Sequence, residues 1–244
     1  YWMKGDLDSA RIYADKVIRS NKFRFASKTS LNTFMQKTVS MEETIWGLYN
    51  AEVYSDWLTQ HVRRQGLGDL TTDFKSIYAY EGPTGKKDYR LDNWFGTYNR
   101  SGTPVDILVK VMGNVSDTTS LTTSYNGGPY LGTSMIRIPE MYYIMSEALL
   151  ATGNAEGAME YLDAVVDARG MEKFADRTPL VDITLSDIMA ERRKEFIGEG
   201  QWWFCLKRLN SPVKLSGATG ATIPGSDKIY VLPLPVEEED YRPE

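Results

Sequence analysis

The stretch "GNAEGAMEYLDAVV", residues 153–166, decides the fold because it repeats the pattern of "GDLDSARIYADKVI", residues 5–18. The matching positions are Gly5 and Gly153, Ala10 and Ala158, Tyr13 and Tyr161, and Val17 and Val165. In each copy a glycine ends one helix, and Asp6 or Asn154 caps the next. The small alanine five residues after the glycine lets two antiparallel helices approach closely. We therefore expect two helical hairpins built on the same plan.

The helix that precedes the second copy is also visible in the sequence. Apolar side chains recur with helical spacing from Met141 to Leu149, and Pro139 stands where the start of a helix tolerates it. The turn and second helix of each copy resemble those of a tetratricopeptide repeat. Because the two copies lie so far apart in the chain, a long insertion must separate them.

The expected insertion, residues 52–134, has a different character. It shows no sustained helical period, and glycine–proline turns interrupt it at 82–83, 102–104 and 127–129. Residues 105–113, "VDILVKVMG", fit a short strand. Its many aromatics argue against disorder and favour a functional segment. These aromatics are Trp57, Tyr78, Tyr80, Tyr89, Trp94, Phe95, Tyr98, Tyr125 and Tyr130.

The last third of the chain returns to helical patterns. "TLSD", residues 184–187, fits a capping box at the start of a helix, and Gly198 and Gly200 break that helix. "QWWFCLKRL" forms a further helix with Trp202, Leu206 and Leu209 on one face. From residue 210 onward the chain is rich in Pro, Gly and Ser, and we expect it to end in an extended segment with an acidic tail.

The composition excludes several classes of function. The net charge of −5 gives no excess of positive charge for nucleic acid. Cys205 is the only cysteine and His61 the only histidine, so neither a disulfide nor a cysteine or two-histidine metal site can form, and no metal site is expected. No apolar run approaches the length of a membrane span. The chain begins inside a helical pattern, and we expect it to be a fragment or a processed product.

The segment "AERRKEFIGEGQWWFCLKR", residues 190–208, raises the question of catalysis. Glu191, Glu195 and Glu199 are spaced by four residues and could share a helix face, and paired carboxylates are the groups that hydrolyse glycosides. In the same helix, however, Arg192 and two more basic residues stand between Glu191 and Glu195, and such mixed charge is typical of a salt-bridged face. A structural role is therefore favoured over a glycosidase role.

The insertion holds the candidate ligand site. Sugars stack their C–H faces on aromatic rings and pair their hydroxyls with polar side chains. Trp94 offers an aromatic ring, and its neighbours offer polar side chains. The candidate ligand-binding residues are Trp94, Tyr98, Tyr80, Tyr78, Asp92, Asn93 and Asn99. The other interpretation, in which the rings merely pack the loop down, stays open beside this one.

Taken together, the motifs resemble the SusD/RagB family of Bacteroidetes outer-membrane nutrient-binding lipoproteins. "RIPEMYYIMSEALLATGNAEGAMEYLDAVVDARG" is similar to the helical pair of that family. "IMAERRKEFIGEGQWWFCLKR" resembles its Glu-Arg-x-x-Glu signature, and "YVLPLPVEEEDYRP" its Pro-x-Pro-x-x-Glu close. The N-terminal repeat with "EETIWGLY" resembles the repeat and strand before the family's variable region. The likeness is strong over 135–244, moderate over 1–50 and absent across the insertion.

The resemblance also shows departures. Trp202 and Cys205 stand where the family often has Arg and Asp, so apolar packing is expected to replace one ion pair. The family's N-terminal part, with its lipidated cysteine, has no counterpart in the chain. The role that the resemblance implies for the signature residues is structural, namely to lock the terminal helices together. These residues are Glu191, Arg192, Glu195, Glu199 and Arg208.

The resemblance implies a mainly α-helical, tetratricopeptide-repeat-like scaffold in a single domain. It comprises a helical repeat and strand (1–51), a variable loop-rich aromatic insertion (52–134), and a C-terminal repeat with the signature (135–244). The implied function is non-catalytic capture of a glycan at the cell surface, for delivery to a SusC-like TonB-dependent transporter in the outer membrane. A lipid anchor outside this chain is implied, and no cofactor. Peptide capture, or a scaffold that binds only a protein partner, are the alternatives.

Overall fold

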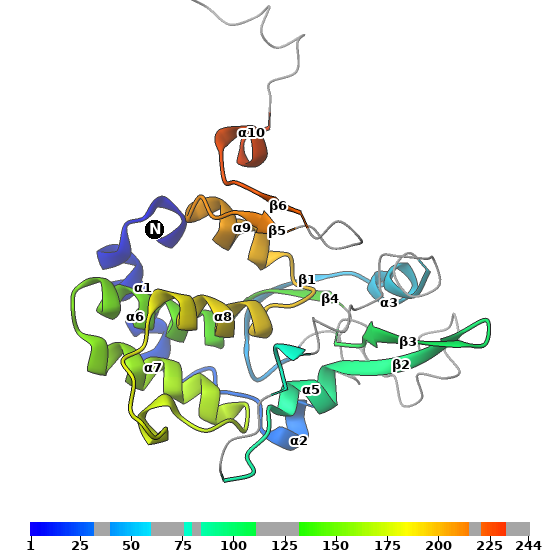
Figure 1. Cartoon of the computed structure of the whole chain (residues 1–244), viewed down its shortest axis with the longest axis horizontal. Coiled ribbons are helices and arrows are strands. Elements are labelled where there is room, and N and C mark those ends of the chain that lie inside the picture. The colour runs from blue at the N-terminus through cyan, green and yellow to red at the C-terminus, as the bar shows by residue number, and fades with distance from the viewer. Residues whose placement is uncertain (32–39, 60–75, 80–83, 111–131, 215–220, 233–244) are drawn as a thin grey trace, which may run out of the picture.

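The structure is a computed structural model of the whole chain. It describes residues 1–31, 40–59, 76–79, 84–110, 132–214 and 221–232. The two repeats form stacked helices on one side of the molecule, where α6 (Ile138–Ala151) lies between α1 (Leu7–Arg19) and α7 (Ala155–Ala168) (Figure 1). A short 3-10 helix, η1 (Trp2–Lys4), precedes α1. The predicted mainly α-helical, repeat-based fold is confirmed.

The helix caps form as the sequence predicts. The side chain of Asp6 accepts a hydrogen bond from the Ser9 amide at 3.0 Å, and that of Asn154 accepts one from the Gly157 amide at 2.9 Å. Each cap satisfies an amide that the first helical turn leaves without a partner. Gly153, in the turn between α6 and α7, has φ 81°, which an L side chain rarely adopts.

The repeated alanines lie at the helix contacts. Ala10 packs with Ile144 and Met145 of α6, and Ala158 packs with Tyr143 on the other side of the same helix. The Ser146 hydroxyl donates to the Ala158 carbonyl at 2.7 Å, so α6 and α7 approach closely enough for a side chain to reach a backbone oxygen. The predicted close packing at Ala10 and Ala158 is confirmed.

A two-stranded antiparallel ladder stands at the base of the insertion. β1 (Thr44–Tyr49) is the strand predicted in "EETIWGLY", and it pairs with β4 (Gly132–Arg137), which the sequence analysis missed. Tyr49 faces Gly132 across the ladder, so the chain between these strands leaves and returns at one place. A Cβ at Gly132 would lie 2.1 Å from the Leu48 carbonyl oxygen, and only glycine fits there.

The described part of the insertion is more regular than predicted. It contains α3 (Val53–Trp57), α5 (Tyr89–Trp94) and the hairpin of β2 (Phe95–Arg100) and β3 (Thr103–Leu108). The hairpin extends away from the helical stack in Figure 1. The predicted strand at 105–113 is therefore confirmed over its first residues, while the expectation of irregular chain at 89–100 is wrong. An Asp88 cap and a helix of only six residues explain the miss, since so short a helix shows no periodicity.

The C-terminal part holds the signature helices. α8 (Leu185–Glu195) begins at the predicted capping box of Thr184 and Asp187, and α9 (Gln201–Arg208) follows after Gly198 and Gly200, both with positive φ. The remaining short elements are α2 (Lys28–Leu31), η4 (Phe174–Asp176), β5 (Val213–Lys214), β6 (Thr222–Ile223) and α10 (Asp227–Tyr230). The expected extended segment at the end of the chain begins at Ile229; its first two residues belong to the one-turn helix α10, and residues 233–244 lie outside the described residues.

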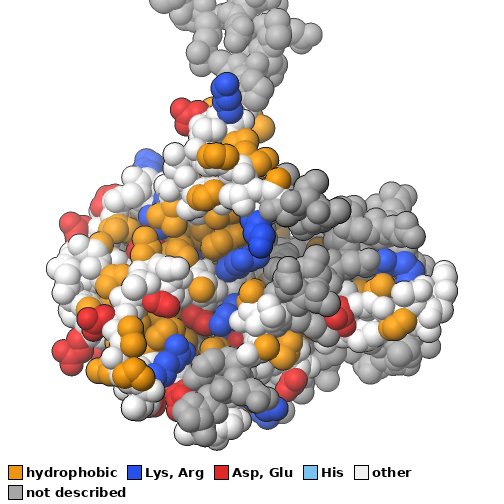
Figure 2. Space-filling view, viewed as in Figure 1, with side chains coloured by type: hydrophobic (Ala, Val, Ile, Leu, Met, Phe, Trp, Pro, Cys, Tyr) orange, Lys and Arg blue, Asp and Glu red, His pale blue; other side chains and the backbone are white. Residues whose placement is uncertain are grey.

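The surface view shows where apolar side chains reach solvent. Figure 2 shows hydrophobic side chains gathered in the area where Figure 1 places α9, with acidic side chains along the left rim. On α9, Trp203 and Phe204 are exposed, while Trp202 packs against the helical core and Cys205 is buried. Within the described ranges, no helix is both long and apolar enough to cross a bilayer.

Candidate functional site

Trp94, the first candidate for sugar stacking, is a core residue. It is the last residue of α5, is 0% exposed, and packs with Leu31, Tyr78 and Phe95. The ammonium group of Lys110 lies 4.0 Å from the centre of its ring. The prediction of an exposed Trp94 indole is wrong, because the capped turn of α5 directs this residue inward where a loop would have left it outside.

Two more of the candidates are buried. Tyr78 donates its hydroxyl to the Lys194 carbonyl at 2.8 Å and packs edge-on against Phe95, and burial raises its pKa. The amide nitrogen of Asn93 donates to the Tyr89 carbonyl at 2.6 Å, within the same short helix. The prediction that Tyr78 and Asn93 face a ligand is therefore wrong, since their polar atoms bond the backbone of the protein.

The remaining candidates stay at the surface or lie outside the described residues. Asp92 and Asn99 are exposed and Tyr98 is half-buried. The side-chain oxygen of Asn99 accepts a hydrogen bond from the Gly102 amide at 2.7 Å, which ties it to the hairpin turn. Tyr80 and His61 lie outside the described residues. The structure thus separates the seven candidates, and a role of Asp92, Tyr98 or Asn99 in ligand binding stays a prediction.

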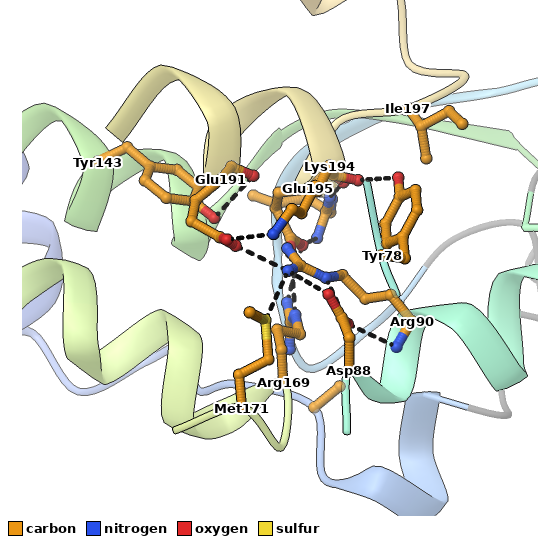
Figure 3. A network of polar contacts seen from close by, with 12 residues as sticks. Tyr78, Asp88, Arg90, Tyr143, Arg169, Met171, Glu191, Lys194, Glu195 and Ile197 are labelled. Atoms are coloured by element: carbon orange, nitrogen blue, oxygen red, sulfur yellow. Dashed lines mark hydrogen bonds and ion pairs between the residues drawn. The ribbon is translucent and has the colours of Figure 1, made fainter. Parts of the chain in front are cut away.

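The carboxylate of Glu195 is the centre of a buried charge network (Figure 3). It is completely buried and accepts from Arg90 at 3.3 Å, from Arg137 at 2.8 Å, and from Arg169 at 2.8 and 2.9 Å. Burial alone would raise the pKa of Glu195, but the facing guanidinium groups together hold it well below its ordinary value. Glu195 therefore stays ionised and fully occupied by protein donors.

The other side of the network joins the ladder to the helices. Glu43, just before β1, pairs with Arg137 at 2.7 Å and with Arg169 at 2.9 Å, and it also accepts from the Ala26 amide at 2.7 Å. Arg137, at the end of β4, donates two bonds to Glu199, at 2.8 and 3.0 Å. These contacts fix both strands at the base of the insertion to the turn after α8.

Glu191 carries the network to α5. It pairs with Arg90 at 2.7 Å and with Lys194 at 2.5 Å, and Arg90 is also held by Asp88 at 2.8 Å (Figure 3). Burial opposes ionisation of Glu191, but Arg90 and Lys194 lower its pKa overall. The predicted pairing of Glu191 and Glu195 with arginines is confirmed.

Lys110, which follows β3, is a further buried cation of the network. Its ammonium donates to the Glu195 carbonyl at 2.7 Å and pairs with Glu199 at 2.5 Å. Burial lowers the pKa of Lys110 to about 8, which the carboxylate of Glu199 only partly offsets. The ion pairs described above balance in charge, with acids Glu43, Asp88, Glu191, Glu195 and Glu199 and bases Arg90, Lys110, Arg137, Arg169 and Lys194.

The last two signature residues lie in a second cluster near the N-terminus. Arg192 pairs with Glu140 at 3.0 Å and donates to the Cys205 sulfur at 3.3 Å, and Arg208 pairs with Glu147. Both guanidinium groups lie about 4 Å from the centre of the Trp2 ring. The expected apolar replacement at position 205 thus keeps a polar contact, because the thiol accepts from Arg192.

Sequence reasoning missed several partners in these clusters. Arg90, Lys110 and Glu43 were not singled out. Arg90 and Lys110 are each flanked by apolar or aromatic residues, which is a signal of a buried ion pair, whereas Glu43 stands between Glu42 and Thr44 and carries no such signal. Also missed were the exposed rings of the ladder, Trp46 and Tyr49, which are 52% and 76% exposed. No group of three or more metal-binding side chains occurs among the residues whose placement is described.

Comparison with known proteins agrees with the architecture. The family model of the SusD family matches residues 111–222, which include β4, α6, α7, α8 and α9. A search of the curated proteins found no match.

Solved structures match nearly the whole chain. A SusD superfamily protein from Bacteroides thetaiotaomicron has a TM-score of 0.71 at 22% identity, covering 97% of this chain and 55% of its own. A surface glycan-binding protein A from the same organism has a TM-score of 0.67 at 16% identity, covering 98% and 58%. A SusD-like carbohydrate binding protein from Bacteroides vulgatus has a TM-score of 0.66 at 18% identity, covering 96% and 54%. The chain spans about half the length of these structures. By sequence the chain resembles the SusD family over residues 111–222, and it shares the fold of these structures over nearly its whole length.

Proposed function

We propose that the protein binds a glycan at the bacterial cell surface and delivers it to a SusC-like, TonB-dependent transporter in the outer membrane. A lipid anchor outside this chain would hold the protein to that membrane. The observation that carries the proposal is the match of the SusD family model to residues 111–222, together with the likeness of the fold to a surface glycan-binding protein. The binding role needs no chemistry from the protein, only a surface that is held in shape.

The buried network supports such a surface. It ties Glu43 before β1, Arg137 in β4 and Lys110 after β3 to the end of α8 and the turn that follows it. Most donors and acceptors of this network are paired, one guanidinium nitrogen of Arg169 being the exception, and a buried network of this kind favours one arrangement of the elements that it joins. The insertion between β1 and β4 therefore projects from a rigid base, and a rigid base lowers the entropy lost when a ligand binds.

The ladder itself supplies exposed aromatic rings. Trp46 and Tyr49 of β1 reach solvent beside Leu48 and Met135. Aromatic rings in this position can stack on the apolar face of a sugar, as Trp94 cannot. We assign the stacking role to Trp46 and Tyr49, with Tyr98 of the hairpin as a further candidate for stacking and Asp92 and Asn99 as candidates for binding sugar hydroxyls.

The signature carboxylates support a non-catalytic function. Glu191 and Glu195 are 3% and 0% exposed, and each is occupied by cationic side chains. An acid or base in glycoside hydrolysis must reach the glycosidic bond or a water molecule. Incubation with glycans should therefore release no sugar.

The test is a binding screen of glycans and peptides against the chain and its Trp46→Ala variant. Stacking on one ring adds about 0.5–1.5 kcal/mol beyond the area buried, so Trp46→Ala should weaken glycan binding about tenfold. The matched control is Trp203→Ala, which removes an equally large, exposed ring from α9. Circular dichroism confirms that both variants fold.

Two results would contradict the proposal. Binding of peptides but of no glycan would favour the peptide alternative. Failure to bind either, with capture of the transporter alone, would favour a scaffold for a protein partner. Equal losses in Trp46→Ala and Trp203→Ala would refute the assignment of the site to β1.

A further inference from the structure

A polar hollow lies where three distant parts of the chain meet. It has a volume of about 320 Å³, and its lining residues come from α2, from the chain before α5 and α5 itself, and from the end of α7. Its lining consists of Lys28, Thr84, Gly85, Lys86, Lys87, Tyr89, Asp92 and Gly170. Pockets that hold small ligands have volumes of about 300–1,000 Å³, so this hollow has room for one sugar ring.

The floor of the hollow is fixed by the buried network. The Tyr89 amide donates to the Arg169 carbonyl at 2.8 Å, and the guanidinium of Arg169 is held by Glu43 and Glu195. A Cβ at Gly170 would lie 2.4 Å from the Tyr89 ring, so the ring lies directly on the backbone. The floor is therefore already ordered, and little conformational entropy is lost there when a ligand binds.

The lining is positively charged although the chain is acidic. Three lysines and one aspartate line the hollow, whereas the chain carries a net charge of −5. A concave surface with charges of one sign concentrates ligands of the opposite sign. The Lys28 ammonium lies 4.6 Å from the centre of the Tyr89 ring, which holds it at the rim.

The charges at the rim remain available to a ligand. Lys86 pairs with Asp167 at 3.8 Å, and both side chains are close to half exposed. Exposed pairs of this kind contribute little, so an anion held between Lys28 and Lys86 can compete with Asp167. Asp92 is exposed at the same hollow and can accept hydrogen bonds from hydroxyl groups.

We propose that this hollow binds an acidic sugar residue of the glycan. Its carboxylate or sulfate group would pair with Lys28 and Lys86, and its hydroxyls would donate to Asp92. The inference rests on the proposed glycan-binding function and narrows the ligand to anionic polysaccharides. A neutral sugar would leave the lysines without a partner from the ligand, and an isolated anion would leave Asp92 without a donor.

The experiment measures binding by titration calorimetry on the full chain. The probes are glucuronic acid, glucose 6-sulfate, glucose and sodium sulfate, all at the same ionic strength. The two acidic sugars should bind more tightly than glucose and more tightly than sulfate, and their comparison distinguishes a carboxylate from a sulfate ligand. Raising the salt from about 50 to about 500 mM should weaken the acidic sugars and leave glucose unchanged.

Variants test the assigned residues. Lys28→Gln and Lys86→Gln should each weaken the acidic sugars about tenfold, since each removes one charge-assisted contact. Lys22→Gln is the matched control, because this exposed lysine lies outside the hollow and its removal changes the net charge equally. Asp92→Ala, which removes the hydrogen-bond acceptor, should weaken the acidic sugars but not sulfate.

The outcomes separate this inference from the proposed function. Equal binding of glucose and glucuronic acid, or variants that behave like Lys22→Gln, would overturn the acidic-sugar site. Sulfate binding as tightly as the sugars would also overturn it. If neutral glycans then bind through Trp46, the proposed function stands without this inference. If no glycan of either kind binds, both fail.

Discussion

Replacing Glu195 by Gln removes one negative charge from the centre of the buried network without changing the shape of the side chain. Each carboxylate oxygen of Glu195 accepts two hydrogen bonds from arginines: one oxygen from Arg137 and Arg169, the other from Arg90 and Arg169. In Gln an NH₂ group replaces one of these oxygens. Two guanidinium donors then face another donor, and three buried cations lose their shared counter-charge.

The expected cost follows from the burial of these groups. Removing one partner of a buried ion pair costs about 3–5 kcal/mol, because the charge left behind stays desolvated. Domains are stable by only about 5–15 kcal/mol, so Glu195→Gln should remove a large part of the free energy of unfolding. In a domain of this size that free-energy difference corresponds to a fall in Tm of about 6–20 °C.

Urea unfolding followed by circular dichroism measures this difference. Glu160→Gln is the matched control, since Glu160 is exposed on α7 and its loss should change stability by less than about 0.5 kcal/mol. A Glu195→Gln variant whose free energy of unfolding lies within about 1 kcal/mol of the wild-type value would refute the buried-network argument. Glycan affinity of the folded fraction should change much less than stability, because the Glu195 side chain is buried and contacts no ligand directly.

The pH dependence provides an independent check on the same residue. The pKa of Glu195 is well below its ordinary value of 4.5 in the folded protein, so between these two values the unfolded chain binds the extra proton. Stability contributed by Glu195 is therefore complete above pH 4.5 and is lost as the pH falls toward the lower folded pKa. The acid-induced loss of stability should be smaller in Glu195→Gln than in the wild type.

Three further variants test other parts of the structure. Burial lowers the pKa of Lys110 to about 8, whereas its pKa in the unfolded chain is 10.5. Between these pH values the unfolded chain binds more protons, so the free energy of unfolding of the wild type relative to Lys110→Met should rise with pH. The expected rise is on the order of 1–3 kcal/mol, measured by urea unfolding at both ends of the range. Ala158→Leu should cost about 1–3 kcal/mol in thermal melts by overpacking the contact of α6 and α7, whereas Ala151→Leu at the exposed end of α6 should be neutral. Trp94→Ala should lower the free energy of unfolding by about 3–5 kcal/mol, and a fully stable Trp94→Ala variant that loses glycan binding would restore the original site.

The helical repeats could be predicted because their signals are local. Asp6 and Asn154 cap amides three residues away, and Gly153 ends its helix through its own φ angle. Thr184 and Asp187 likewise form a capping box within four residues. Each of these contacts is set by the residue types at neighbouring positions, so the sequence alone indicates them.

The network could be predicted only in part because its contacts join distant positions. The sequence shows that Glu191 and Glu195 alternate with basic residues, which favours ion pairs, but their main partners are not on the same helix. Glu195 pairs with Arg137 and Arg169, which lie at the ends of β4 and α7. Only the pairing of β1 with β4 and the stacking of the helices bring these side chains together.

Trp94 shows why aromatic content alone does not locate a binding surface. Its neighbours are charged or turn-forming, and that composition is equally compatible with a ring that faces solvent and with one that anchors a short helix. The Asp88 cap and the close approach of Tyr89 to Gly170 decide between them, because they fix α5 against the end of α7. The same contact that buries Trp94 leaves Asp92 at the surface beside Lys28 and Lys86. We therefore expect Trp94 to affect ligand binding only through the position of α5, because the polar groups around it, and not the buried ring, are the ones that a ligand can reach.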